Sequence, residues 1–180
     1  ATEAQCEWAI ATAERHAAAR GGWDGRGHHY QHKTNNIVVA DNRELTRWVQ
    51  GLLVDTIWPA IKMQFDIDAN DLWLEDCFLV KYEASGQAGL GRHFDSCELS
   101  FNLLLSDPES FQGGGTAFFD AEQEVTLHPK RGEVLTHYAL LYHEGKPIVG
   151  GAPRYILAGF VRVQPLAKRW KELRPRTGPY

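Results

Sequence analysis

Apolar side chains recur at helical spacing within the first twenty residues of the chain. Thr2 followed by Gln5 is the pattern of a capping box, in which the two side chains bond backbone N–H groups at a helix start. Gly21 and Gly22 stop the pattern because glycine favours the conformations that end a helix. The sequence therefore predicts a helix whose apolar positions are Cys6, Ala9, Ile10, Ala13 and Ala17.

A second helical stripe follows a short apolar run at 37–39, which itself predicts a strand. Asp41 with Glu44 offers a second capping box. Pro59 is expected to kink or end this helix near Trp58, because its ring clashes with the preceding turn. The stripe is typical of a surface helix with one broad apolar face and comprises Leu45, Trp48, Val49, Leu52, Leu53 and Ile57.

From Leu72 onward the apolar period changes to two, which predicts β-strands separated by turns rich in Gly, Pro, Asp and Ser. The expected strands are 72–83, 98–105, 116–119, 124–127, 133–138 and 154–163. Helices followed by many short strands are typical of an all-β sandwich, jelly roll or small barrel with helices on one outer face. We expect one domain over 1–180, with helical support at about 1–65, a β core at about 72–164 and a basic tail at 166–180.

The composition is that of an ordinary globular protein, with 43% hydrophobic and 23% charged residues among 180. The net charge is −4, but residues 166–180 carry a local charge of +4, which leaves −8 for the rest. This distribution argues against a nucleic-acid partner, although the tail could touch an acidic one. Because every apolar run is far shorter than a bilayer is thick, we also expect no membrane span.

Cysteines and termini indicate little about compartment. Cys6, Cys77 and Cys97 cannot all pair within one chain, and their spacing matches no zinc site, so we expect no disulfide framework. The chain starts at Ala1 without a charged and apolar signal segment. It has the appearance of a processed or excised piece, so localisation stays open, as does the oligomeric state.

Two histidines and one carboxylate are the candidate metal ligands. His93 and Asp95 flank Phe94, and residues two apart in an extended segment project to the same face. His143 ends a predicted strand and precedes a Gly/Pro turn. Alone, the His-x-Asp pair is more often a surface pair than a metal site. Together the three form the facial set that holds non-haem Fe(II) and leaves adjacent positions free for a bidentate co-substrate and O2.

Arg154 is expected on the apolar face of the last strand, beside Ile156 and Ala158. A buried guanidinium needs an anion, and a bidentate carboxylate suits its fork. A structural salt bridge to a protein carboxylate is the alternative. Ser100, Asn102 and Tyr82 also read as inward-facing and would line a hydrophilic cavity, or equally would be ordinary satisfied polar groups.

An ordered set of motifs now resembles a known family. These are the strand FLVKY, then HFD, SFNLLL, GGGTAFF, HEGKP and RYILAGF, spread over roughly residues 30–164. The set resembles the 2-oxoglutarate- and Fe(II)-dependent dioxygenases, and looks most like the catalytic domain of procollagen lysyl hydroxylases and prolyl 4-hydroxylases. HEGKP followed by RYI, and YQHKTNNIVVAD upstream, lean towards the lysyl branch. No single motif is specific, but the ordered set is.

The resemblance implies a double-stranded β-helix, or jelly roll, with iron near one mouth. It makes His93, Asp95 and His143 the iron ligands and gives Arg154 the distal carboxylate of 2-oxoglutarate. Tyr82 and Asn102 would be weaker co-substrate contacts. The implied cofactors are Fe(II), 2-oxoglutarate and O2, with ascorbate for maintenance. The implied reaction couples decarboxylation of 2-oxoglutarate to succinate and CO2 with hydroxylation of an unactivated C–H bond.

One departure and several other histidines bear on this assignment. Arg154 follows His143 by eleven residues, one more than the family spacing, and a bulge at Gly150-Gly151 or Pro153 would absorb the surplus. His137 lies near the distal ligand position, but HEGKP fits better. His128 precedes a proline in a turn and is expected to be exposed. The cluster of His28, His29 and His32 is expected to be structural or exposed, or else part of a substrate-covering loop with Trp23 and Tyr30.

The leading hypothesis is a hydroxylase of a peptidyl lysine or proline. A second keeps the chemistry on a free amino acid, another small metabolite or an alkylated base, of which the last is disfavoured by the modest charge. A third, from another class, is a non-catalytic jelly-roll module that binds a metal or ligand.

Overall fold

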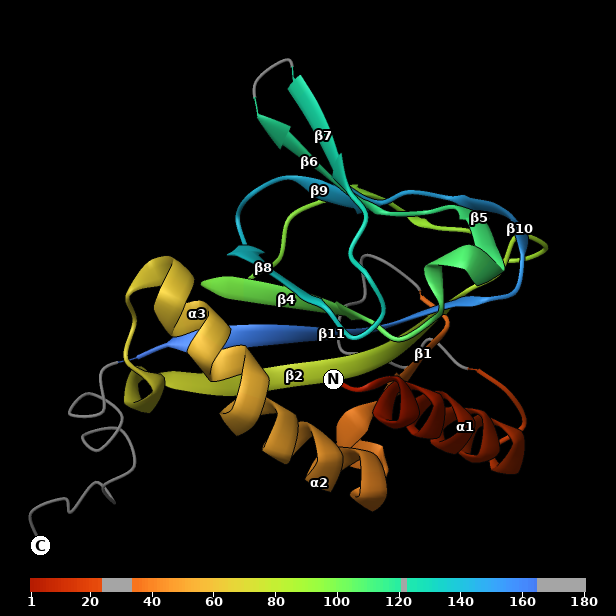
Figure 1. The fold of residues 1–180 in the computed structure, drawn as a ribbon, viewed down its shortest axis with the longest axis horizontal. Coiled ribbons are helices and arrows are strands. Elements are labelled where there is room, and N and C mark those ends of the chain that lie inside the picture. Colours follow the sequence, from red (N-terminus) through yellow and green to blue (C-terminus); the bar gives the residue numbers. More distant parts are fainter. Residues whose placement is uncertain (24–33, 121–122, 165–180) are drawn as a thin grey trace, which may run out of the picture.

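The computed structural model describes residues 1–23, 34–120 and 123–164. Three helices cover one face of a five-stranded sheet, and smaller sheets face the opposite side of that sheet (Figure 1). The molecule is therefore mostly β with flanking N-terminal helices, and the expected jelly roll is confirmed.

The helices are α1 (Glu3–Ala19), α2 (Arg43–Leu52) and α3 (Trp58–Phe65), with a π-helical segment at Leu53–Ile57 and short 3-10 turns at Val39–Asp41, Ala69–Asp71 and Pro108–Ser110. The strands are β1 (Asn36–Val38), β2 (Leu72–Tyr82), β3 (Leu90–His93), β4 (Leu99–Leu104), β5 (Phe111–Gly113), β6 (Thr116–Asp120), β7 (Gln123–Leu127), β8 (Val134–Tyr138), β9 (His143–Gly145), β10 (Ile148–Gly151) and β11 (Arg154–Val163).

The first helix forms as expected, with the reciprocal capping box of Thr2 and Gln5 in place. The second N-cap is Asn42, not Asp41, because the Asn42 side chain accepts from the N–H groups of Glu44 and Leu45. Pro59 does not end the helical segment. It lies in the first turn of α3, directly after the π-helical segment, where a missing N–H donor costs little.

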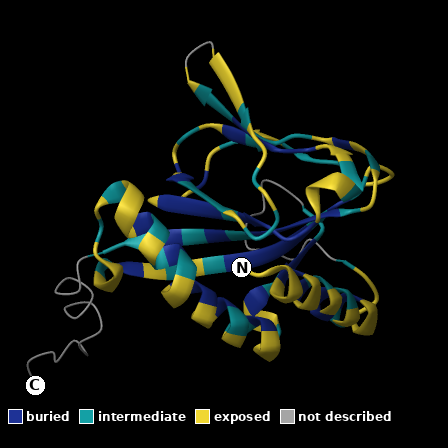
Figure 2. Ribbon diagram, viewed as in Figure 1, coloured by how far each residue is buried: buried dark blue, intermediate teal, exposed yellow. Residues whose placement is uncertain are grey.

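The five-stranded sheet has the order β1-β2-β11-β4-β8, with β11 in the middle. Its two longest strands, β2 and β11, pair from Arg154 opposite Tyr82 to Val163 opposite Leu72. Leu79, Phe101 and Leu157 lie on the helix-facing side within one cluster that includes Cys6 and Leu45. The strands of this sheet are accordingly the most buried part of the molecule (Figure 2).

The opposite side of the sheet faces the interior of the jelly roll. A smaller apolar cluster lies there, made of Phe78, Val80, Tyr82, Leu104, Ile148 and Ile156. A four-stranded sheet of order β3-β9-β6-β7 and the pair β10-β5 close this interior. The hairpin of β6 and β7 projects beyond the body of the molecule (Figure 1).

All seven expected strands, including the run at 37–39, are present within one or two residues of their predicted ends. Four short strands were not predicted: β3, β5, β9 and β10. Each has only three or four residues and contains glycine, so the alternation that marks a strand has no room to appear. Two of these strands carry the candidate histidine ligands.

The three cysteines are free, and His128 is exposed. The histidine cluster at 28–32 and the basic tail lie outside the described residues, and the one-domain division stays a prediction. None of the described helices is long and apolar enough to cross a membrane.

We expect Leu157→Ala to lower the free energy of unfolding by about 2–5 kcal/mol, because Leu157 is fully buried on the central strand and its loss leaves a cavity. Urea titration followed by circular dichroism measures this. Val149→Ala, at a side chain that is 72% exposed, is the control and should change stability by less than about 0.5 kcal/mol. Equal midpoints for the two variants would contradict the packing described above.

Candidate metal centre

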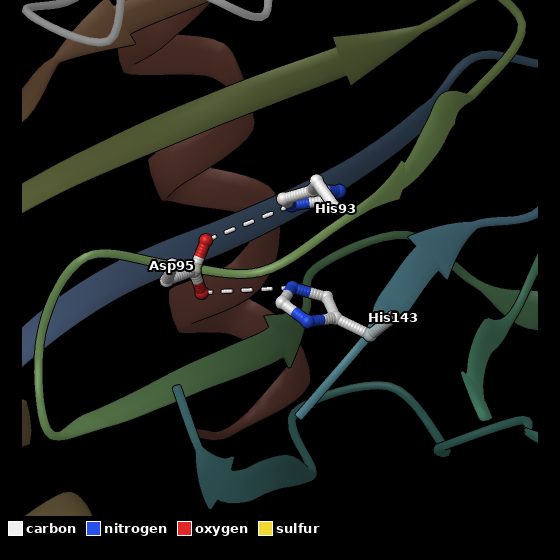
Figure 3. Close-up of side chains that lie close together, drawn as sticks. All are labelled: His93, Asp95 and His143. Carbon is white, nitrogen blue, oxygen red and sulfur yellow. Dashed lines mark ion pairs between the residues drawn. The ribbon is translucent and has the colours of Figure 1, made fainter. Parts of the chain in front are cut away.

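His93, Asp95 and His143 come together from segments far apart in the chain (Figure 3). His93 is the last residue of β3, and His143 is the first residue of β9. These strands are antiparallel and pair the two histidines in register, so both rings lie on the same face. Phe94 turns away from that face and packs edge-on against Tyr142, as the alternation predicted.

The donor atoms of this triad lie within 4.8 Å of one another. Nε2 of His93 is 3.6 Å from Oδ1 of Asp95, and Nε2 of His143 is 3.5 Å from Oδ2 of the same carboxylate. These separations are close to those of two ligands on one ion with bonds of about 2 Å. The triad can therefore hold one metal ion with little rearrangement.

Backbone carbonyl groups set the tautomer of both imidazoles. Nδ1 of His93 lies 2.7 Å from the oxygen of Gly91, and Nδ1 of His143 lies 2.8 Å from the oxygen of Leu141. A carbonyl oxygen only accepts, so Nδ1 carries the proton in each ring and Nε2 carries the lone pair. Both Nε2 atoms, which face Asp95, are thus in the state that binds a metal.

Asp95 is held through both its side chain and its backbone. The hydroxyl of Ser100, on β4, donates to Oδ2 at 2.6 Å. The backbone N–H of Asp95 donates to the carbonyl oxygen of Ala139 at 2.8 Å. Asp95 is only 8% exposed, so these bonds fix a largely buried carboxylate between the two histidines. Ser100 thereby faces inward, as predicted.

Burial also sets the charge of the site. Desolvation lowers the pKa of His93 below its ordinary value, and the charge of His143 lowers it further. His93 is consequently neutral near pH 7. Two imidazole Nε2 atoms and one carboxylate form the donor set that non-haem Fe(II) takes, with part of its coordination sphere left open.

Arg154 begins β11 and is 2% exposed. It makes no ion pair with a carboxylate among the described residues, and its Nη1 atom has no hydrogen-bond partner there. The expected alternative of a structural salt bridge is therefore wrong for this part of the chain. Its guanidinium carbon lies 5.5 Å from the ring centre of Tyr82, and burial lowers its pKa.

Tyr82 links Arg154 to the strand that carries His143. It pairs with Arg154 in the sheet, and it is almost fully buried, which raises the pKa of its phenol. A Cβ atom added to Gly145, two residues after His143, would lie 3.3 Å from the Tyr82 hydroxyl. Arg154 and Tyr82 thus share the interior with the triad.

Glycine makes room for the arginine. Gly114 has φ +72°, and an added Cβ would lie 3.2 Å from Cδ of Arg154 and 3.1 Å from the ring of Phe111.

The extra residue between His143 and Arg154 corresponds to an irregularity in a nearby strand pair. In the pairing of β10 with β5 the register shifts between Ile148 and Gly150, which makes Val149 an extra residue. A bulge thus lies one residue before the predicted Gly150-Gly151.

Asn102 lies on β4 two residues beyond Ser100, hence on the same face, and pairs with Ala158 of β11.

Two interior residues were not assigned to the site from sequence. His137 has its ring centre 4.6 Å from that of His143, and Phe118 lies 5.0 Å from His137. The sequence placed His137 on the predicted strand 133–138 and near the distal ligand position, but the HEGKP motif favoured His143 as that ligand.

Comparison with known proteins agrees with this geometry. Residues 77–162 match the 2OG-Fe(II) oxygenase superfamily. They contain all three members of the triad, together with Tyr82, Asn102 and Arg154. The match covers just under half of the chain and supports an oxygenase enzyme similar to that superfamily, which uses Fe(II), 2-oxoglutarate and O2. A search among curated proteins found no match.

Several solved structures share the fold at low sequence identity. A Pseudomonas putida prolyl-4-hydroxylase has 17% identity and a TM-score of 0.65, over 92% of this chain and 89% of its own. A Trichoplax adhaerens prolyl hydroxylase, solved with a hypoxia inducible factor peptide fragment, has 14% identity and a TM-score of 0.63, over 95% and 83%. The α-ketoglutarate-dependent carbocyclase SnoK from nogalamycin biosynthesis has 13% identity and a TM-score of 0.67, over 100% and 86%.

We expect Ser100→Ala to weaken metal binding by about 10- to 100-fold, because Asp95 loses the hydroxyl that orients its carboxylate. Anaerobic titration of Co(II) against a competing chelator measures the dissociation constant. Ser110→Ala, whose hydroxyl bonds only the backbone of Asp107, is the matched control. If both variants bind Co(II) as tightly as the unmodified chain, Ser100 does not support the centre.

Proposed function

We propose that this chain is a 2-oxoglutarate-dependent Fe(II) hydroxylase that acts on a peptidyl lysine or proline. The observation that carries the proposal is a pair of buried charges inside one jelly roll. Among the described residues, the only Asp, Glu, Lys or Arg side chains that are buried are Asp95, set between two histidines, and Arg154, which has no carboxylate partner. The site at Asp95 therefore requires a bound cation, and the site at Arg154 requires a bound anion.

In this proposal His93, Asp95 and His143 hold the iron. The pairing of β3 with β9 orients the two imidazoles, and Ser100 orients the carboxylate. When bound, the iron and 2-oxoglutarate supply the oxidation that forms succinate and CO2 and hydroxylates an unactivated C–H bond. The protein's own part is to keep three ligands on one side of the ion and to exclude water from the interior.

Arg154 would hold the distal carboxylate of 2-oxoglutarate. Its guanidinium is buried, cannot lose its proton near pH 7 and offers a planar fork that matches a carboxylate. The phenol of Tyr82, beside it, is held in its neutral form by burial and can donate one more hydrogen bond. Asn102, on the inward face of β4, is a further candidate contact.

A peptidyl substrate is favoured by the motifs HEGKP and RYILAGF, which include His143 and Arg154. It is also favoured by the shared fold of the two prolyl hydroxylases, one of which was solved with a peptide. We further propose ascorbate as the reductant that maintains the iron.

A small-molecule substrate is the second candidate. The carbocyclase SnoK has the same fold over the whole of this chain, with a TM-score above those of the prolyl hydroxylases. Such a substrate would use the same metal ligands and the same Arg154, so the two candidates differ only in what enters above the metal. The family match argues against a non-catalytic module.

We expect Arg154→Ala to raise the KM for 2-oxoglutarate by about 30-fold or more, because truncating one partner of a buried charge pair costs about 2–5 kcal/mol. Succinate formation with Fe(II), ascorbate and varied 2-oxoglutarate measures it. The control is Arg162→Ala on the same strand, where the guanidinium is partly exposed and pairs with Glu75. An unchanged KM in Arg154→Ala would remove this arginine from the co-substrate site.

For the substrate, we expect lysyl or prolyl peptides to gain one oxygen atom and to stimulate succinate formation, while free lysine and proline do not. Mass spectrometry of reactions with matched peptides and free amino acids measures the products. His143→Ala is the control for iron-dependent turnover. Oxygen insertion into the free amino acids but not into any peptide would favour the second candidate.

A further inference from the structure

Few buried side-chain nitrogen and oxygen atoms in the described part of the chain lack a hydrogen-bond partner. The four side-chain atoms of this kind are Asn36 Oδ1, Trp48 Nε1, His137 Nε2 and Arg154 Nη1. Two of them, on His137 and Arg154, lie in the interior that holds the triad. The proposed co-substrate supplies a partner for Arg154, but the function proposed so far gives none to His137. An orphaned buried nitrogen is costly enough to require an explanation.

His137 lies against the proposed metal centre. It is 5% exposed on β8 and pairs across the sheet with Ser100, the residue whose hydroxyl holds Asp95. Its ring centre is 4.6 Å from that of His143 and 5.0 Å from that of Phe118. The unpartnered nitrogen is therefore enclosed by groups that belong to the centre or stack on it.

The contacts of the ring define what the missing partner must be. Nδ1 of His137 lies 3.0 Å from the carbonyl oxygen of Tyr138, which can only accept, so Nδ1 carries the proton. A protonated ring would place a second N–H group, on Nε2, in a buried position without an acceptor, so the neutral ring is the form that fits this site. Nε2 accordingly holds a lone pair, and its missing partner is a hydrogen-bond donor.

The distance argues against direct ligation. The donor atoms that lie within 4.8 Å of one another are those of His93, Asp95 and His143, and His137 is not among them. An atom bound to the ion at about 2.1 Å and hydrogen-bonded over about 2.8 Å would bridge a longer gap. The bridging atom must be a donor, which the two carboxylates and the keto group of 2-oxoglutarate are not. Water is a donor.

We propose that His137 is a positioning residue of the metal centre, whose Nε2 accepts a hydrogen bond from a water molecule on the open side of the bound ion. This inference rests on the proposed metal ligands. The contact stabilises the form of the centre in which that position is filled by water, and it completes the hydrogen bonding of the buried imidazole.

The test uses the full chain loaded anaerobically with Co(II) alone. Five-coordinate Co(II) absorbs visible light more strongly than six-coordinate Co(II), so one titration reports both affinity and coordination. The variants are His137→Phe, which keeps the ring but removes the acceptor, and His137→Gln, which restores an acceptor. His128→Gln controls for loss of an exposed histidine, and melting of the metal-free variants by circular dichroism checks folding.

We expect His137→Phe to absorb more strongly per bound Co(II), with an affinity that falls by about tenfold, the low end for residues outside the ligand set. His137→Gln should return the spectrum to that of the unmodified chain. The proposal is overturned by an unchanged spectrum in His137→Phe, or by failure of His137→Gln to restore it, which would assign the effect to ring packing. Loss of Co(II) as complete as in His143→Ala would also overturn it, since His137 would then be a ligand.

His143→Ala separates this inference from the proposed function. If His143→Ala binds Co(II) as tightly as the unmodified chain, the proposed metal ligands are wrong and both proposals fail. If His143→Ala loses Co(II) while His137→Phe behaves as the unmodified chain, only the role of His137 is rejected.

Discussion

The in-register pairing of His93 with His143 is the contact on which the site depends. Neither β3 nor β9 is longer than four residues, so their own ladder is a weak constraint. Their positions are fixed by neighbours: β9 also pairs with β6, and Asp95 bonds Ala139 and Ser100. The major sheet, packed on the helices through Leu157 and Phe101, is the rigid body to which this small ladder is tied.

The five-stranded sheet also carries a buried positive charge, opposite in sign to that of Asp95. Arg154 opens β11, the central strand, and its pairing with Tyr82 places a guanidinium in an apolar interior. Isolated burial of this kind would destabilise the fold by several kcal/mol. A protein can tolerate that free-energy cost where a bound anionic ligand pairs with the buried charge. The absence of a side chain at Gly114 keeps space for the arginine, so the GGG motif belongs to the site as much as to the turn.

Sequence reasoning succeeded where a pattern is local and long. The alternation around Ser100 placed its hydroxyl inside, and the His-x-Asp spacing placed two candidate ligands on one face. It failed where tertiary contacts decide. The strand that carries His143 is too short to show a period, and its partner carbonyl on Leu141 is backbone, which no side-chain pattern reveals. His137 was set aside because the HEGKP motif favoured His143 as the distal ligand, whereas the unpartnered Nε2 of His137 appears only in three dimensions.

Charge balance joins these observations. Among the described residues, Asp95 contributes the one buried negative charge and Arg154 the one buried positive charge, while burial lowers the pKa of His93 and of His137 and favours their neutral forms. Fe(II) brings two positive charges and 2-oxoglutarate brings two negative ones. The interior is therefore formally neutral both before and after it takes up the pair, whereas either one alone would leave two uncompensated charges in a low-dielectric space. This argues that metal and co-substrate bind with mutual support, each lowering the electrostatic cost of the other.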